Sequence, residues 1–282
     1  MSVIKEQNVT MKPYSNMKIG GIAKSLTFIE DEKELIDFFN KDERYYLLGN
    51  GTNTLINDEY LDINFVSLKK LNKIEKISQN TVYAQAGADL SDLISFMEKN
   101  DLSGLENISG IPGSIGGLVN MNGGAYGTTI FDKIESVKIF ITDKNEIKVF
   151  KKQDIEHRYR GTAIKDNHWI VIGATFVFDK GFDKEASQDK INKRKNNHPL
   201  DFPNLGSTFK NPEGNFAAQL ISDCELKGYR IGDMEVSPKH PNFLINHGNG
   251  KFSDVLELIN NIKKTVFEKT GIMLDTEIII IK

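Results

Sequence analysis

Apolar residues recur along the chain at two spacings, and each spacing predicts a different element. Apolar side chains three or four positions apart favour helices, and runs rich in branched or aromatic residues between turn residues favour strands. The segments with helical spacing are 31–40, 89–100, 216–226 and 253–270. The segments with strand character are 45–48, 63–68, 81–86, 134–141, 146–150, 169–178, 242–246 and 276–281. The mixture of both types predicts an α+β protein.

Two of the expected helices have recognisable ends. The helix over 89–100 begins at Asp89, a residue type whose side chain caps free backbone amides. The helix over 253–270 is followed by Gly271, which readily adopts the left-handed conformation that ends a helix. The side chains that this last helix is expected to bury are Val255, Leu256, Ile259, Ile262, Val266 and Phe267.

The segment 183–197 is highly charged and includes Lys190, Lys193, Arg194 and Lys195. Such a run is typical of a solvated helix. We therefore expect this helix to connect two domains, with the second domain beginning near residue 183.

Net charge and cysteine content restrict the class of protein. The net charge is −3 and the pI is about 6.0, which lacks the basic excess of a nucleic-acid-binding domain. The single cysteine, Cys224, excludes an internal disulfide and is expected to be a buried, idle thiol. No apolar run approaches the ~20 residues that cross a membrane, and the N-terminus lacks a signal-peptide pattern. We expect a cytoplasmic protein without a membrane partner.

Two segments offer backbone amides that are able to surround a phosphate group. The first, Leu48–Leu55, contains a Gly-Asn-Gly turn. The second, Gly110–Gly127, has seven glycines among its eighteen residues. Glycines lose much backbone entropy on folding, and close approach of the chain to a ligand is one reason for them; packing between strands is the alternative. Neither segment has the spacing of a Rossmann fingerprint or a Walker A loop.

These two segments, in this order, resemble the FAD-binding domain of UDP-N-acetylenolpyruvoylglucosamine reductases, which belong to the flavoproteins that include vanillyl-alcohol oxidase. Gly110–Gly127 is similar to the longest motif of the reductases. Further similar motifs follow in the same order along the chain: Met17–Gly21, Tyr159-Arg160, Gly206–Pro212, Ser237–His240 and Leu274–Glu277.

The resemblance implies a two-part FAD-binding domain of the vanillyl-alcohol-oxidase-like type over 1–182, with its subdomains divided near 75–85. An α+β substrate-binding domain over 183–282 is implied to follow it. FAD is expected to bind without a covalent link. The residues expected to bind FAD are Gly49, Asn50, Gly51, Thr52, Asn53, Leu55, Gly110, Ile111, Pro112, Gly113, Ser114, Gly116, Gly117, Asn120, Asn122, Gly123, Ala125 and Gly127.

The resemblance also implies the reaction. NADPH reduces FAD, and the enolpyruvyl group of the UDP-sugar is then reduced to a lactyl ether, which gives UDP-N-acetylmuramate for peptidoglycan synthesis. The implied catalytic residues are Ser207 as proton donor, Arg160 as stabiliser of the enolate, and Glu277, which orients the assembly or shares a proton. Arg158 is a rival for the arginine, but the family pattern selects the one directly after Tyr159. Glu277 also begins an apolar run, where a charge needs a partner.

The UDP group must meet cations or amides, and the chain offers several. The residues expected to bind substrate are Tyr126, Tyr159, Lys210, Asn211, Arg230 and Lys239. The stretch between Trp169 and Ser207 is too short for the tyrosine-bearing loop of one branch, so the chain resembles the shorter, second type. The terminal motif is Leu-Asp-Thr-Glu, where the family commonly has Leu-Glu-Pro-Glu. A monomer is the expectation, although no residue pattern fixes the oligomeric state.

Two other functions stay open from the residues alone. One is a sugar or alcohol oxidase on the same FAD fold, and the other is a flavin or nucleotide sensor without turnover. Retention of Ser207, Arg160 and Glu277 favours the reductase. The five histidines have no metal-ligand spacing, so no metal site is expected.

Overall fold

The computed structural model describes residues 4–39 and 44–282, which divide into two compact units. Unit 1 contains the described parts of Met1–Glu6, Ser25–Asn50 and Ile63–Lys193. Unit 2 contains Gln7–Lys24, Gly51–Asp62 and Arg194–Lys282. Each unit has its own hydrophobic core. No single position along the chain separates the two units, because Gln7–Lys24 and Gly51–Asp62 belong to unit 2. The expected domain boundary lies at one position, residue 183.

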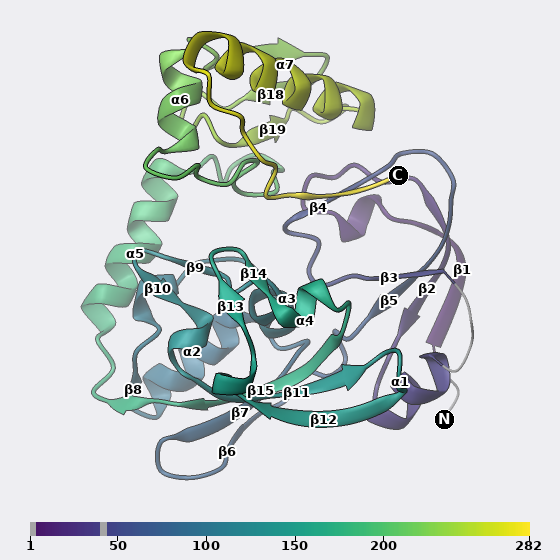
Figure 1. Ribbon diagram of the computed structural model, residues 1–282, viewed down its shortest axis with the longest axis vertical. Helices are drawn as coiled ribbons and strands as arrows, with labels where there is room; N and C mark the ends of the chain where they lie inside the picture. Colours follow the sequence, from purple (N-terminus) through teal and green to yellow (C-terminus); the bar gives the residue numbers. More distant parts are fainter. Residues whose placement is uncertain (1–3, 40–43) are drawn as a thin grey trace. The chain divides into compact units, whose positions relative to one another are not determined.

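Unit 1 is built on a five-stranded antiparallel sheet with the order β12-β11-β15-β7-β6. The central strand, β15 (Ile170–Val177), is buried over its first five residues, as its nearly continuous apolar sequence requires. Helices α2, α3 and α4 lie on one side of this sheet (Figure 1). The remaining bounds are β6 (Ile74–Lys76), β7 (Thr81–Gln85), β11 (Ile134–Ile141), β12 (Glu146–Lys151), α2 (Leu90–Lys99), α3 (Ile115–Asn120) and α4 (Ala163–Asp166).

Shorter elements complete unit 1. A second sheet has the order β1-β2-β5-β3, and its first three strands continue into unit 2. Its bounds are β1 (Ile4–Thr10), β2 (Ile22–Phe28), β5 (Leu61–Ser67) and β3 (Tyr45–Leu47), and α1 covers Glu32–Phe39. The short strand pairs are β8 (Leu102–Ser103) with β16 (Asp179–Lys180), β9 (Gly124–Ala125) with β10 (Thr128–Thr129), and β13 (His157–Arg158) with β14 (Gly161–Thr162). The expected helix over 31–40 is confirmed as far as Phe39, and its last residue lies outside the described residues.

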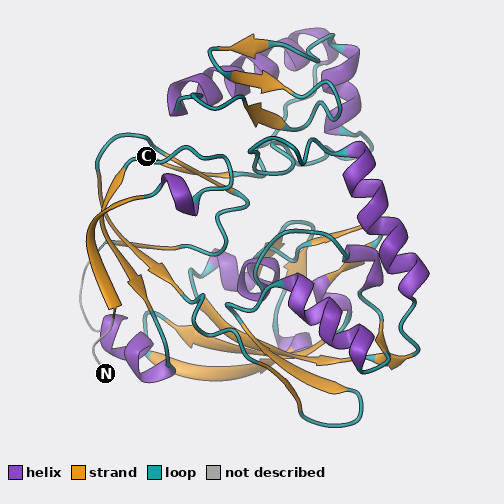
Figure 2. Ribbon diagram, turned by 180° about the vertical axis from the view of Figure 1, so that it is seen from behind, coloured by secondary structure: helices purple, strands orange, loops and turns teal. Residues whose placement is uncertain are grey.

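Helix α5 (Lys184–Asn197) confirms the expected charged helix and carries the chain from unit 1 into unit 2. In unit 2, α6 (Ala217–Asp223) and α7 (Phe252–Thr270) cover one face of a three-stranded antiparallel sheet (Figure 2). The strands of this sheet are β17 (Arg230–Ile231), β18 (Met234–Val236) and β19 (Leu244–Asn246). A parallel pair joins β4 (Thr54–Ile56) to β20 (Ile279–Ile281). Single 3-10 turns cover η1 (Lys12–Tyr14), η2 (Glu106–Ile108), η3 (Ile130–Asp132) and η4 (Lys152–Asp154).

Helix α7 has the expected end and nearly the expected buried face. Gly271 follows it with a φ of 72°, and Val255, Ile259, Ile262 and Val266 are buried, whereas Leu256 is partly buried. The expectation for Phe267 is wrong, because this side chain is 48% exposed. It directly follows the buried Val266, so its side chain is turned by about 100° from the buried row of the helix.

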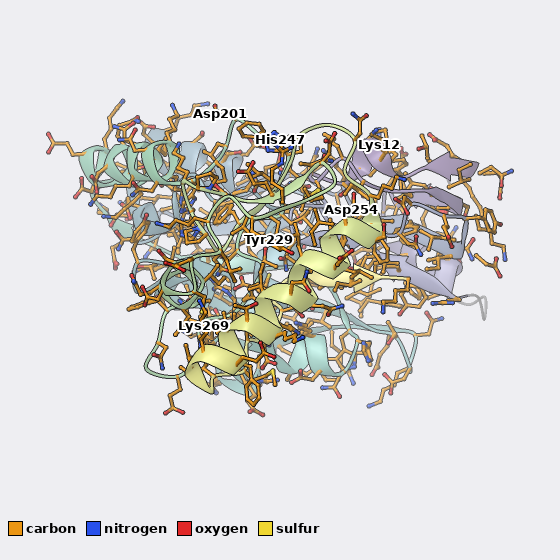
Figure 3. The ribbon with its side chains drawn as sticks, turned by 90° about the horizontal axis from the view of Figure 1, so that it is seen from above. Lys12, Asp201, Tyr229, His247, Asp254 and Lys269 are labelled. Carbon is orange, nitrogen blue, oxygen red and sulfur yellow. The ribbon has the colours of Figure 1, made fainter. Side chains whose placement is uncertain are left out.

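Polar contacts fix α7 along its length (Figure 3). At its start the Lys251 N–H donates to Asp254 Oδ2 (3.0 Å). In its middle Asn261 Nδ2 donates to the Tyr229 hydroxyl (3.2 Å), and near its end Lys269 Nζ donates to the carbonyl of Cys224 (3.3 Å). Burial raises the pKa of the Cys224 thiol, which agrees with an idle cysteine. None of the described helices is long and apolar enough to span a bilayer.

The expected cap at Asp89 is wrong. Asp89 does precede α2 with extended backbone angles, but its side chain makes no capping hydrogen bond. Its Oδ1 instead accepts a hydrogen bond from Asn50 Nδ2 (2.6 Å). The first amide of the helix, that of Leu90, donates to the carbonyl of Gly113 (3.0 Å). A long-range contact has replaced the local one that the residue type suggested.

Candidate active site

In unit 1, the two glycine-rich segments meet at Ser114. A Cβ atom on Gly49 would lie 3.2 Å from Ser114 Oγ, so the first segment passes directly against the second. Ser114 forms an isolated antiparallel bridge with Asp89, the residue that holds the Asn50 side chain. Ser114 Oγ also accepts from the Gly117 N–H (3.3 Å) and caps α3. The fold therefore joins Gly49 and Asn50 to the start of Gly110–Gly127.

The glycines of the second segment have different physical reasons. A Cβ on Gly124 would lie 2.2 Å from the carbonyl oxygen of Thr128, and one on Gly123 would lie 2.4 Å from Leu118 Cδ2. These two glycines serve the packing of the chain on itself. Gly127 differs, because its φ is 79° and no heavy atom lies within 4 Å of its Cβ position. Packing thus explains the glycines at positions 123 and 124. It does not explain Gly127, which lies beside open space.

The hairpin β13–β14 presents Arg160 at its turn. Arg160 has a φ of 56°, which is uncommon for a residue with a long side chain and marks a candidate functional position. Its Nη2 donates to the carbonyl of Gly124 (3.2 Å), and its guanidinium carbon lies 5.0 Å from the centre of the Tyr159 ring. The turn therefore faces the Gly110–Gly127 segment.

Arg158 and Arg160 have different surroundings. Arg158 Nη1 forms an ion pair with Asp166 Oδ2 (2.8 Å), and both side chains are half-exposed. This pairing raises the pKa of Arg158 and lowers the pKa of Asp166. The Arg158 backbone is also tied to the second segment, since its carbonyl accepts from Asn122 Nδ2 (3.3 Å). A carboxylate thus engages the Arg158 side chain, whereas Arg160 reaches the glycine-rich segment.

In unit 2, Ser207 lies on an extended segment between two others. Ser207 forms an isolated antiparallel bridge with Phe243 on one side, and Phe209 forms one with Thr276 on the other. The Glu277 N–H donates to the carbonyl of Thr208 (2.8 Å). Ser207 and Glu277 are seventy positions apart in sequence, yet they stand on directly paired segments.

Asn53 joins the same group. Its Nδ2 donates to the carbonyl of Glu277 (3.2 Å), and its own carbonyl accepts from the Ile279 N–H (2.9 Å). The parallel pair β4–β20 continues this contact. Unit 2 therefore brings one expected FAD-binding residue and two expected catalytic residues to the same place.

Asn242 holds the segment that carries Ser207, and the sequence patterns did not single it out. Its side chain is buried and pairs with the backbone of Phe209 in both directions: Oδ1 accepts from the N–H (2.9 Å) and Nδ2 donates to the carbonyl (2.8 Å). The Asn242 carbonyl accepts from the Thr208 N–H (2.7 Å). The available signal was an asparagine directly before the apolar run of β19, where a buried amide requires partners.

Asn204 is a second missed residue. Its Oδ1 accepts from the Gly206 N–H (3.0 Å), and Gly206, whose φ is 75°, directly precedes Ser207. The Asn204 carbonyl accepts from Asn16 Nδ2 (2.7 Å). The turn that leads into Ser207 is thus fixed by side chains as well as by the flanking strands.

Two of the expected substrate-binding cations contact other residues of unit 2. Lys239 Nζ donates to the carbonyl of Lys195 near the end of α5 (2.7 Å). Arg230 Nη2 lies 4.0 Å from Asp233 Oδ1. Both cations have partners within unit 2.

The other expected substrate-binding residues also have contacts inside the protein. Asn211 Oδ1 accepts from the Ala217 N–H (3.1 Å) at the start of α6. In unit 1, Lys190 Nζ lies 5.3 Å from the centre of the Tyr126 ring. The Lys210 backbone N–H donates to the carbonyl of Asp275 (2.9 Å).

Two histidines of unit 2 lie behind the Ser207 segment. The rings of His198 and His240 are 5.2 Å apart, and each also packs on Phe243, the bridge partner of Ser207. Burial is the main cause that lowers the pKa of His198 to about 4, and burial also lowers the pKa of His240. Both rings are therefore neutral near pH 7. Within the described residues, no group of three or more histidine, cysteine or acidic side chains is arranged to hold a metal ion.

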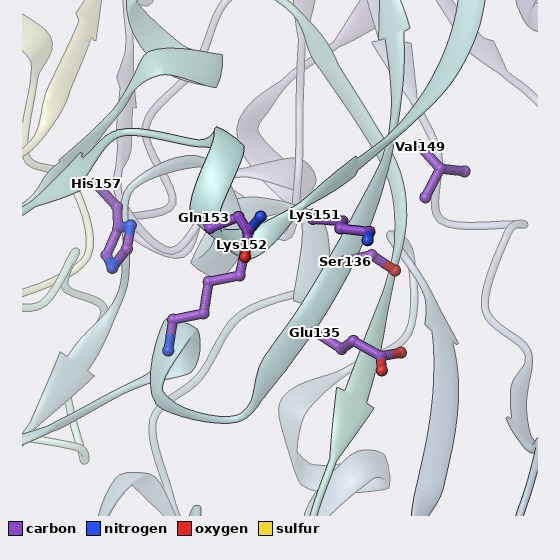
Figure 4. Close-up of a pocket in the computed structure, with 7 residues that line it drawn as sticks. All are labelled: Glu135, Ser136, Val149, Lys151, Lys152, Gln153 and His157. Carbon is purple, nitrogen blue, oxygen red and sulfur yellow. The ribbon is translucent and has the colours of Figure 1, made fainter.

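A depression of about 690 Å³ lies elsewhere on unit 1, on the hairpin of β11 and β12 (Figure 4). Its lining residues are Glu135, Ser136, Val149, Lys151, Lys152, Gln153 and His157. The His157 ring stacks on Phe131 and its Nδ1 contacts the carbonyl of Ile155 (2.9 Å). None of the expected site residues lines this depression.

Comparison with known proteins gives a family for both halves of the chain. Residues 27–149 match the family model of an FAD binding domain, and residues 198–281 match that of the UDP-N-acetylenolpyruvoylglucosamine reductase C-terminal domain. The reductase of Fusobacterium nucleatum is 51% identical over 98% of this chain and 98% of its own length. The reductase of Clostridium novyi is 42% identical over 98% of this chain and 92% of its own length.

The chain belongs to the UDP-N-acetylenolpyruvoylglucosamine reductase family. A solved structure of the reductase from Thermus caldophilus agrees, with a TM-score of 0.84, 28% identity and complete coverage of both chains. The resemblance and the fold class are confirmed, and this member of the reductase family is an FAD-dependent oxidoreductase.

The residues of unit 1 fit the FAD of this reductase family. Asn122 is 5% exposed, and its Oδ1 is buried without a hydrogen-bond partner in the described part of the chain. A buried acceptor of this kind needs a donor from outside the chain, and a bound ligand or an ordered water is able to supply one. The joined glycine-rich segments, with Gly127 beside open space, offer backbone groups to the same ligand.

Proposed function

We propose that this chain reduces UDP-N-acetylenolpyruvoylglucosamine to UDP-N-acetylmuramate, with NADPH as reductant, in the synthesis of peptidoglycan precursors. The observation that carries the proposal is the direct pairing of the Ser207 and Glu277 segments, which Asn53 joins. A proton donor and a carboxylate on paired segments suit a reaction that must deliver a proton to a carbon atom.

The cofactor would be held by the two glycine-rich segments. We propose the eighteen expected residues within Gly49–Leu55 and Gly110–Gly127 as the FAD contacts, with Asn122 Oδ1 as one acceptor. The proposal assigns no covalent link. Bound FAD supplies the transfer of hydride from NADPH to the substrate.

Ser207 donates the proton. Addition of hydride to the terminal carbon of the enolpyruvyl group leaves negative charge at the carbon beside the carboxylate, and a proton must reach that carbon. A serine hydroxyl is a weak acid, but an enolate is a strong base, so transfer is efficient when the two are aligned. The turn held by Asn204 and the strand held by Asn242 provide that alignment.

Arg160 and Glu277 assist the reaction at the substrate carboxylate and at the enolate. The Arg160 guanidinium donates two parallel hydrogen bonds to the substrate carboxylate and stabilises the enolate as it forms. Glu277 orients the reacting groups or shares the proton that Ser207 transfers. We also propose that Tyr126, Tyr159, Lys210, Asn211, Arg230 and Lys239 bind the nucleotide, and that the chain works as a cytoplasmic monomer with domains over 1–182 and 183–282.

The test is turnover with matched nucleotides. NADPH oxidation by the purified protein should require the enolpyruvyl nucleotide, and UDP-N-acetylglucosamine, which lacks the double bond, should give none. NADH in place of NADPH tests the reductant. Oxygen consumption with a hydroxylated sugar and no NADPH would instead establish an oxidase, and FAD binding without turnover of any of these substrates would establish a sensor.

A further inference from the structure

The side chain of Asp89 does not cap helix α2. It stands at the start of α2 but makes no bond to the amides of that helix. The amides of Asp92 and Leu93 donate to its backbone carbonyl (3.1 and 3.2 Å), and the Leu90 amide donates to Gly113. Three of the first four amides of α2 therefore have acceptors without the carboxylate.

The carboxylate instead receives the Asn50 side-chain amide across thirty-nine positions of sequence, at 2.6 Å. A carboxylate only accepts hydrogen bonds, so the NH2 group of Asn50 must face it. The orientation of the amide is thereby fixed, and its Oδ1 is directed away from Asp89. A hydrogen bond to a charged group is about twice as strong as a neutral one.

The backbone on both sides of Asp89 binds the second segment at the same time. The Leu90 N–H donates to the carbonyl of Gly113 (3.0 Å) and the Ile115 N–H donates to the carbonyl of Ala88 (2.8 Å), and these bonds pair Asp89 with Ser114. The Asp89 side chain contacts Asn50, and its backbone lies opposite Ser114. Asp89 therefore links the first glycine-rich segment to the second.

We propose that Asp89 is a positioning residue for FAD, which fixes the Asn50 amide and keeps the two cofactor segments in register. The proposal rests on the flavin binding of the proposed function but not on its substrate or proton transfer. In this proposal the Asp89 carboxylate acts through Asn50 and does not itself contact the substrate.

The experiment compares FAD affinity in four proteins. Each is stripped of cofactor and titrated with FAD, and binding is followed by flavin fluorescence. Asp89→Ala should raise the Kd by about ten- to a hundredfold, the factor for a lost hydrogen bond to a charged group. Asp89→Asn, which still offers an acceptor to Asn50, should recover part of this loss.

The matched control is Asp92→Ala, which removes the same charge from the same first turn at an exposed position. It should leave the Kd within about twofold of the wild type. Equal effects of Asp89→Ala and Asp92→Ala would overturn the proposal in favour of a general charge effect.

A double-mutant cycle separates positioning from loss of fold. In an Asn50→Ala background, Asp89→Ala should have no further effect on the Kd, because both changes break one bond. An equal further loss in that background would show that Asp89 does not act through Asn50 and would overturn the proposal. These titrations need neither NADPH nor nucleotide, so a failure here and a failure of the proposed reaction are distinguishable.

Discussion

The two units hold their own candidate site residues in contrasting ways. Unit 1 uses loops, and the backbone conformations of glycine and of Arg160 determine what those loops present. Unit 2 uses extended segments from three distant parts of the chain, and backbone hydrogen bonds place Ser207 beside Glu277. Loops with many glycines suit the wrapping of a large cofactor, whereas paired strands hold single side chains in fixed positions.

The contrast predicts different responses to substitution. Changes in unit 1 should act on cofactor affinity or on charge stabilisation, depending on whether a loop backbone or the Arg160 side chain is altered. Changes in the paired segments of unit 2 should act on stability and proton transfer together, because the same bonds support both.

Of the changes that test this contrast, Arg160→Ala is expected to have the largest effect. Loss of a donor that stabilises developing negative charge slows the chemical step by about 10²–10³-fold. The control is Arg158→Ala, which removes the neighbouring guanidinium that pairs with Asp166 at a half-exposed position. Steady-state kcat with saturating nucleotide should fall only for Arg160→Ala. A comparable fall in kcat for Arg158→Ala would contradict the assignment of charge stabilisation to Arg160.

Asn242→Ala should give the next largest effect. It leaves the buried N–H and carbonyl of Phe209 without partners, at a cost of about 1–3 kcal/mol for each group. Denaturant unfolding should show lower stability, and proton transfer should slow, because Ser207 stands on the same segment. A loss of stability with an unchanged rate of proton transfer would show that the Ser207 segment keeps its position without Asn242.

Substitution of two glycines should distinguish packing from open space. Gly124→Ala places a Cβ 2.2 Å from the Thr128 carbonyl, where the backbone must shift, and should cost about 1–3 kcal/mol. Gly127→Ala meets no atom within 4 Å and should cost about 1–2 kcal/mol, from its positive φ alone. Unfolding measurements without FAD test this order. The reverse order would contradict the assignment of Gly124 to self-packing.

The smallest effect is expected from pH. The neutral form of His198 is favoured in the folded protein, so its contribution to stability is present above pH 6.5 and is lost as the pH falls from about 6.5 to about 4. Burial is the main cause, with smaller contributions from His240, Arg194 and Lys239. The ring is partly exposed, so we expect about 1 kcal/mol, or about 2–4 °C of melting temperature.

The matched variant for this pH effect is His198→Phe, which keeps an aromatic ring but cannot titrate. Its melting temperature should fall less between pH 7 and pH 4.5 than that of the wild type. An equal fall in both proteins would show that His198 does not contribute to the pH dependence.

Local sequence patterns predicted the helices α1, α2, α5, α6 and α7, four strands of the main sheet of unit 1 and the two glycine-rich segments, because those features depend on neighbouring residues. The patterns missed the short helices α3 and α4 and the strand β6. The end of α7 at Gly271 is a clear case. The pattern failed where a distant partner decides the outcome. Asp89 has the residue type of a cap but contacts Asn50, and Asn242 pairs with Phe209 across thirty-three positions. No spacing along the chain reveals such pairs.

The family motifs reached further than the patterns did. They selected Ser207, Arg160 and Glu277, but they did not reveal that Ser207 and Glu277 stand on paired segments with Asn53. The two-unit division was equally hidden, because two N-terminal segments join unit 2 through contacts formed only in the fold.

The most direct test of the central claim is stopped-flow absorbance of Ser207→Ala, with Glu277→Gln beside it. The flavin is first reduced with NADPH and then mixed anaerobically with the enolpyruvyl nucleotide. The account predicts that both variants are reduced at the wild-type rate and that reoxidation by the nucleotide slows by about 10²–10⁴-fold in Ser207→Ala. Equal slowing of both half-reactions, or unchanged reoxidation, would contradict the assignment of Ser207 as the proton donor.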